Sequence, residues 1–226
     1  ETVDANKERL KGIKDSLRGL FVGSGAADCE TLQNMYASKV EAAKGNLDAL
    51  KEILSMLRRV RCQEIEAFYA AAAYAYELEP SADAAVGCAA MAFKKGDIDG
   101  SVKFFDEAIN LETDNAKKAD NAYKAASVLA SAKKLSQARS YAQKAISFNE
   151  NFGAPYILIA QLYAGNYKWN DEPALNKCTF FAAIDKLQRA KAVDPSVAEE
   201  ANKLISSYSA YTPEAKDLFM LGYKAR

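Results

Sequence analysis

The chain has 226 residues, half of them hydrophobic, and its 30 Lys and Arg residues balance 30 Asp and Glu residues. A net charge of zero provides no long-range positive field, so we expect no general binding to nucleic acids or anionic membranes. The absence of histidine excludes Ser-His-Asp and Cys-His catalysis and histidine-ligated metals. We expect no cofactor and no bound metal.

The hydrophobic pattern predicts helices along nearly the whole chain. Near the N-terminus, Leu10, Ile13, Leu17 and Leu20 share one helical face. No stretch alternates with a period of two for long enough to predict a strand. The predicted helices span residues 3–21, 29–43, 46–61, 64–78, 82–95, 98–112, 116–132, 135–149, 153–164, 177–193, 196–210 and 213–225.

Short turns separate these segments, which indicates antiparallel helix pairs and an all-α fold. Side chains that commonly cap helix N-termini stand before several of the predicted helices. These residues are Asp28, Asn46, Ser81, Asp97 and Thr212. No predicted helix is apolar enough to span a bilayer.

The four cysteines do not form a Cys-x-x-Cys pair, so they lack the spacing of zinc knuckles and thioredoxin-like sites. Cys29 begins one predicted helix and Cys62 follows the next, so an antiparallel pair would bring them together. They are either a disulfide, which would indicate an oxidising compartment, or two free thiols. Cys88 lies in an apolar helical stretch and is expected to be buried, and Cys178 follows a polar loop.

One segment, residues 84–115, carries a pattern that returns along the chain. It has small residues at Ala89 and Ala92, a turn at Gly96, and Phe105 and Ala108 on its second helix. Equivalent alanines stand at Ala75, Ala145 and Ala190. In chain order, the four alanines are separated by 33, 37 and 45 residues. This pattern resembles the tetratricopeptide repeat (TPR) family, in which helix pairs of about 34 residues stack to complete a core.

The resemblance implies a right-handed α-solenoid of about six antiparallel helix pairs, forming one domain over residues 1–226. The recognisable repeats cover 49–195, with an insertion at 165–176. Residues 1–48 are expected to form divergent N-terminal helices, and 196–226 a C-terminal capping pair. Three features also resemble exported TPR proteins of Gram-negative bacteria: the Glu-Leu-Glu-Pro motif at 77–80, the paired cysteines and the C-terminal sequence 178–225. This resemblance implies a periplasmic or otherwise exported protein and brings no activity with it.

In the TPR family, the first helix of each pair lines a concave groove that binds peptides or partner proteins. Carried over residue by residue, the resemblance implies groove positions at Asp83, Val86, Phe93, Asp120, Tyr123, Ser127, Ile157 and Gln161. Several of these side chains would alternatively pack against neighbouring helices. The family's Lys and Asn pair for a C-terminal carboxylate has no counterpart at these positions.

The insertion carries Tyr167 and Trp169, the only tryptophan. Trp169 is expected either to form an interaction hot spot or to cover hydrophobic core at the end of its helix pair. Cys178 lies just beyond this loop.

We therefore expect a non-catalytic scaffold or adaptor that binds a peptide or partner protein in the concave groove. One alternative is a self-assembling structural solenoid, because the ends of helical arrays can stack into oligomers. Another is a glycosidase that uses two carboxylates, since this chemistry needs no histidine. Its candidate acids are the pairs Asp97/Asp99, Asp171/Glu172 and Glu199/Glu200.

Overall fold

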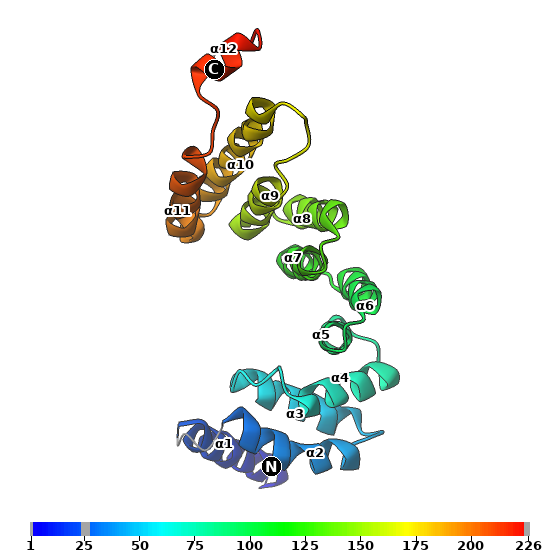
Figure 1. Ribbon diagram of the computed structural model, residues 1–226. Helices are drawn as coiled ribbons and strands as arrows, with labels where there is room; N and C mark the ends of the chain where they lie inside the picture. The colour runs from blue at the N-terminus through cyan, green and yellow to red at the C-terminus, as the bar shows by residue number, and fades with distance from the viewer. Residues whose placement is uncertain (1, 24–27, 224–226) are drawn as a thin grey trace. The chain divides into compact units, whose positions relative to one another are not determined.

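The computed structural model describes residues 2–23 and 28–223, with only the backbone described at some positions of the first helix (Figure 1). These residues form α-helices and one short 3-10 helix, and no strand occurs among them. The elements are α1 (Thr2–Gly23), α2 (Cys29–Ala42), α3 (Leu47–Arg59), α4 (Glu66–Leu78), α5 (Ala82–Lys94), α6 (Ile98–Leu111), α7 (Asn115–Ser131), α8 (Leu135–Phe148), α9 (Gly153–Gly165), α10 (Pro173–Val193), η1 (Pro195–Val197), α11 (Ala198–Ser209) and α12 (Ala215–Met220).

The chain divides into two compact units, residues 1–91 and residues 92–226. In the first unit, α2, α3 and α4 pack together around fully buried residues such as Leu50 and Leu57. In the second unit, consecutive helices pack as neighbours from α6 to α11, and α7 also contacts α9. The expected single domain over residues 1–226 stays a prediction.

Three of the helix pairs turn through the same backbone motif. Arg61, Gly96 and Lys133 each follow the first helix of a pair and adopt a left-handed conformation, with φ of 60°, 80° and 59°. The next N–H donates back to a carbonyl five residues earlier, in the bonds Cys62 N to Leu57 O, Asp97 N to Ala92 O and Lys134 N to Leu129 O. This is the Schellman arrangement of helix C-termini. The repeat in the sequence is therefore a repeat of backbone geometry.

The four alanines that mark the repeat are equivalent in the structure. Ala75, Ala108, Ala145 and Ala190 are all buried. The carbonyl of each accepts the N–H that ends its helix, donated by Glu79, Glu112, Asn149 and Asp194 respectively. A residue with no side chain beyond Cβ allows helices to approach closely at these points. The register predicted from alanine spacing is thus the register of the packed helices.

Most of the predicted helix starts carry the predicted caps. Asp28, Asn46 and Asp97 each accept a backbone N–H from the first turn of α2, α3 and α6, and the hydroxyl of Ser81 accepts the N–H of Ala84. The prediction that Thr212 is an N-cap is wrong. Its hydroxyl donates to the carbonyl of Ser209 at the end of α11 instead.

Two helices near the C-terminus, α10 and α12, differ from their predicted limits by several residues. Helix α10 begins at Pro173 rather than at residue 177, because Glu172 caps it and proline is tolerated in a first turn. Helix α12 ends at Met220, where the predicted helix continued to residue 225. A left-handed Gly222 stops the helix there. No helix of the described residues is long and apolar enough to cross a membrane.

The structure pairs Cys29 with Cys62 in a disulfide, with the Cα atoms 5.3 Å apart. The bond joins the first residue of α2 to the residue that follows the turn after α3. The buried Cys88 and the partly buried Cys178 take no part in a disulfide.

Candidate functional site

The residues expected to line a groove lie on α5, α7 and α9, the first helices of three successive pairs. Asp83 and Val86 belong to the first compact unit, and the remaining six residues belong to the second.

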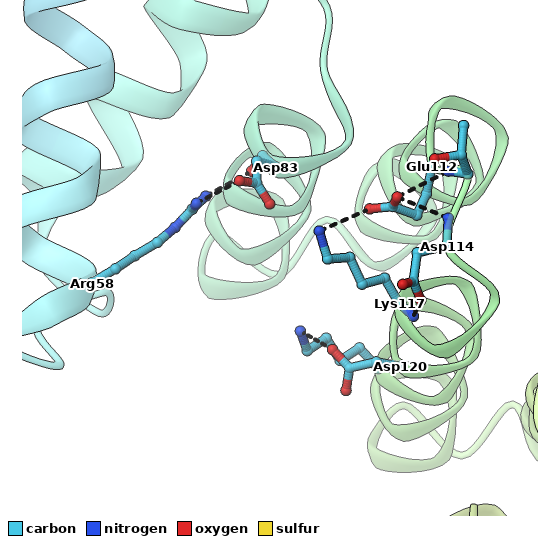
Figure 2. Close-up of polar contacts among 8 residues, drawn as sticks. Arg58, Asp83, Glu112, Asp114, Lys117 and Asp120 are labelled. Carbon is cyan, nitrogen blue, oxygen red and sulfur yellow. Dashed lines mark hydrogen bonds and ion pairs between the residues drawn. The ribbon is translucent and has the colours of Figure 1, made fainter.

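In the first unit, Asp83 is already engaged by a neighbouring helix. Its carboxylate lies 2.6 Å from Nη1 of Arg58, which extends from α3 (Figure 2). The guanidinium also lies 5.8 Å from the ring centre of Phe68 on α4. Asp83 stands in the first turn of α5, where a negative charge favours the helix dipole. Val86 is half-buried beside it.

In the second unit, α7 presents a row of polar and aromatic side chains one helical turn apart. Asp120 forms an ion pair of 2.6 Å with Lys124. The hydroxyl of Ser127 donates to the carbonyl of Tyr123, 3.0 Å away. The ring of Tyr123 meets that of Phe152 edge to face, with centres 5.3 Å apart. Tyr123 is half-buried, so its ring braces the junction between α7 and the start of α9 while part of it stays accessible.

Two further positions are open to solvent. Phe93, at the end of α5, is 42% exposed. Gln161, on α9, is exposed as well. Both side chains are available to a partner without any rearrangement of the helices.

Ile157 does not lie on an open surface, which corrects the expectation that it lines the groove. It is only 4% exposed and belongs to a buried cluster with Tyr156, Ala160 and Leu187. Helix α9 is apolar around most of its circumference because it packs against α7, α8 and α10. Ile157 therefore supports the fold and is not accessible to a bound peptide.

The turn before α7 holds a compact polar cluster that the sequence analysis did not identify. The carboxylate of Glu112 accepts the N–H groups of Asp114 and Thr113, at 3.1 and 2.9 Å. These two bonds, together with Lys117 at 3.9 Å, lower the pKa of Glu112 (Figure 2). Asp114 in turn caps α7 by accepting the N–H of Lys117. The cluster fixes where α7 begins and so positions its exposed face.

The inserted loop is held in place by one buried amide. Oδ1 of Asn176 accepts the N–H groups of Trp169 and Asn170, at 2.9 and 2.8 Å, and its Nδ2 donates to the carbonyl of Asn170. The indole N–H of Trp169 donates to the hydroxyl of Thr179 at 2.9 Å. Trp169 nevertheless remains 60% exposed. The loop thus presents a fixed tryptophan at the surface, and Trp169 does not cover the core.

Tyr167, the second aromatic residue of the loop, lies against Phe180 of α10 with ring centres 5.3 Å apart. Phe180 also contacts Tyr208 and Tyr211 from the region of α11. Burial raises the pKa of the Tyr208 hydroxyl. Tyr167 is half-buried, so it contributes to packing at the base of the loop more than to its open surface.

Four of the six acidic residues considered for a glycosidase serve as helix caps or form ion pairs. Asp97 caps α6, Asp99 pairs with Lys134, Glu172 caps α10 and Glu199 pairs with Lys203. Within the described residues, no group of three or more Cys, Asp or Glu residues lies together as a metal site. These contacts favour a structural role for the carboxylates.

Comparisons with known proteins find similarity in structure alone. No family model matches the sequence, and no curated protein matches it. Two crystal structures of MamA match with TM-scores of 0.56 and 0.57, at 19% and 18% identity, covering 80% and 83% of this chain and 94% and 93% of theirs. The crystal structure of YrrB, described as a TPR protein with an unusual peptide-binding site, matches with a TM-score of 0.53 at 21% identity, covering 83% of this chain and 89% of its own. The chain thus has the all-α solenoid fold of the tetratricopeptide repeat proteins.

Proposed function

We propose that this chain is a non-catalytic interaction module that binds a peptide or a partner protein along the first helices of its repeats. The observation that carries the proposal is the arrangement of α7 and α9 in the second unit. These helices contact each other directly, and they carry the half-buried Asp120, Tyr123 and Ser127 and the exposed Gln161. The peptide-binding site that the YrrB structure's description reports, on a similar fold, supports the same use.

The chemistry of this face suits an extended peptide. The Asp120–Lys124 pair supplies both signs of charge, and the amide of Gln161 can donate and accept hydrogen bonds. The accessible part of the Tyr123 ring adds apolar contact area with few rotatable bonds. A peptide with mixed polar and apolar side chains would therefore find partners along α7 and α9.

The inserted loop is a second candidate surface for the same function. Trp169 is exposed, although the backbone of its loop is fixed by Asn176. A large aromatic side chain that is already ordered loses little conformational entropy when it binds. Tryptophan is also enriched among residues that dominate binding energies. A partner that spans α9 and the loop would use Trp169 as an anchor.

We also propose that the protein works in an oxidising compartment, as an exported or periplasmic protein would. The disulfide between Cys29 and Cys62 supports this proposal, because such bonds persist outside the reducing cytosol. Purifying the protein from its native compartment and measuring its free thiols tests it. Two free thiols per chain, from Cys88 and Cys178, are expected, and four would contradict it.

An affinity capture with matched variants tests the binding surface. The tagged chain is compared with the first-helix variant Phe93→Ala/Gln161→Ala and with the second-helix control Gln143→Ala/Arg189→Ala, which changes exposed residues of α8 and α10. We expect a defined set of captured proteins that the first-helix variant loses and the control keeps. Equal capture by all three forms would contradict the proposal.

The loop is tested separately with Trp169→Ala and Thr179→Val. The second variant removes the hydroxyl that holds the indole N–H and keeps the indole itself. If the loop binds the partner, Trp169→Ala should lose capture while Thr179→Val retains most of it. Equal behaviour of these two variants would argue against direct contact with the tryptophan.

A further inference from the structure

Helix α1 carries an apolar face that solvent reaches. Leu10, Ile13, Leu17 and Leu20 are 65%, 50%, 62% and 71% exposed. Their spacing places them along one side of the helix over nearly three turns. We call these four residues the N-terminal apolar face. Monomeric proteins seldom leave so regular an apolar stripe uncovered, and amphipathic helices use this spacing to dock in grooves.

The last part of the second unit has exposed apolar residues and a recess. Tyr211, Phe219, Met220 and Tyr223 are all more than half exposed. Between α12 and the start of α10 lies an open recess of about 340 Å³. We call these four residues, with the recess, the C-terminal apolar surface. The recess is lined by Glu172, Pro173, Ala174, Lys177, Asp217, Met220 and Leu221.

The charges of the two regions are complementary. The sequence of α1 contains five basic and three acidic residues. The sequence from residue 198 to residue 226 is neutral, with four acidic and four basic residues, so the complementary charge lies at the recess itself. Two carboxylates, Glu172 and Asp217, also line the recess beside one lysine. A basic amphipathic helix matches, in both polarity and charge, a recess that apolar residues and two carboxylates line together.

We propose that the N-terminal apolar face of one copy of this chain docks on the C-terminal apolar surface of a second copy. Stacked helix pairs complete their core by covering the exposed face of a neighbour, and a second copy provides that neighbour. The contact joins two different surfaces, so each copy keeps one free face of each kind. Such an interface extends into longer assemblies unless it closes into a ring.

A single helix in a shallow recess forms a small interface, at the lower end of the range for specific complexes. We therefore expect reversible assembly that increases with protein concentration. We also expect high salt to weaken it, because part of the attraction is between exposed charges.

Sedimentation velocity on the oxidised full chain, over a wide range of concentrations, tests the proposal. One variant, Ile13→Gln/Leu17→Gln, removes the N-terminal apolar face, and a second, Phe219→Gln/Met220→Gln, removes the C-terminal apolar surface. Glutamine keeps the charge and the helix propensity nearly unchanged. Leu111→Gln, at an apolar residue that is 45% exposed on α6, is the matched control. Circular dichroism confirms that each variant remains folded.

Mixing the two variants gives the decisive result. Each alone should stay at the monomer mass, whereas an equimolar mixture should form a two-chain species that grows no further. The unmodified chain and Leu111→Gln should form species larger than two chains at high concentration. A chain that stays monomeric at every concentration, or variants that assemble alone, would overturn the proposal.

A contact between identical surfaces would also overturn it, and it would appear as one variant that forms dimers alone while the other variant stays monomeric. So would docking of α1 on a membrane. That outcome would appear as binding of the monomeric chain to vesicles of anionic phospholipid, lost in Ile13→Gln/Leu17→Gln.

Discussion

A close contact between two helices of the first unit gives a sharp test of the packing. At Gly87 on α5, an added Cβ would lie 2.3 Å from Cβ of Ala72 on α4. Carbon atoms pack at roughly 3.5–4.0 Å, so a Gly87→Ala variant must separate the helices by more than 1 Å. Ala72 has no rotatable side chain, and a change of rotamer therefore cannot relieve the overlap.

We expect Gly87→Ala to lower the free energy of unfolding by about 2 kcal/mol. Overpacking of this kind costs roughly 1–3 kcal/mol, or more where the backbone must move. Replacing glycine inside a helix returns up to about 1 kcal/mol. For a chain of this length, the net loss corresponds to a decrease of roughly 4–8 °C in the melting temperature.

Thermal and urea unfolding of two comparison variants separate the contact from the helix effect. Gly12→Ala, on α1, places its Cβ where no other atom lies within 4 Å. It should be neutral or slightly stabilising. Ala72→Gly/Gly87→Ala moves the methyl group across the contact and should recover much of the stability lost in Gly87→Ala. If Gly87→Ala is as stable as the unmodified chain, α4 and α5 do not approach each other as closely as described at Gly87.

Three further predictions concern single residues of the second unit. Lys133 occupies a left-handed conformation that glycine adopts without strain. Lys133→Gly should therefore increase the free energy of unfolding, measured in urea, by about 1 kcal/mol, and a decrease would contradict this. The hydroxyl of Ser101 is buried without a hydrogen-bond partner. Ser101→Ala should therefore increase the free energy of unfolding by about 1 kcal/mol, which a higher melting temperature would show. Asp194 accepts hydrogen bonds from Ser196 and Gly153, which hold the pKa of its carboxyl below the usual range. The ionised carboxylate stabilises the fold at neutral pH, and this stabilisation is lost as the pH falls through the lowered pKa. Asp194→Asn should therefore lower the free energy of unfolding by about 1 kcal/mol near pH 7, and by progressively less below about pH 4.

The sequence predicted the helices well because each boundary depends on local chemistry. Alanine spacing set the repeat register, and capping residues such as Asp28 and Asn46 lie next to the helices that they begin. The left-handed turn at Lys133 was not predictable in this way. Its equivalent in the preceding repeat is Gly96, but nothing in the lysine itself indicates a positive φ.

The candidate site was less predictable, because exposure depends on packing between helices. Ile157 follows the groove pattern of the TPR family, yet neighbouring helices cover it. Asn176 holds the inserted loop through three hydrogen bonds, and an asparagine beside a polar loop gives no sign of such a role in the sequence. The sequence left open whether Trp169 is exposed or covers the core, because its exposure depends on how the loop folds.

Site-specific photo-crosslinking tests the central claim most directly, that the first helices of the repeats bind a protein partner. A photoreactive phenylalanine is placed at Gln161 on α9 or at Gln143 on α8, both of which are exposed, and each chain is irradiated in its native compartment. The account predicts one defined crosslinked partner from position 161 and none from position 143. Crosslinking from position 143 alone, or no crosslink from position 161, would contradict it.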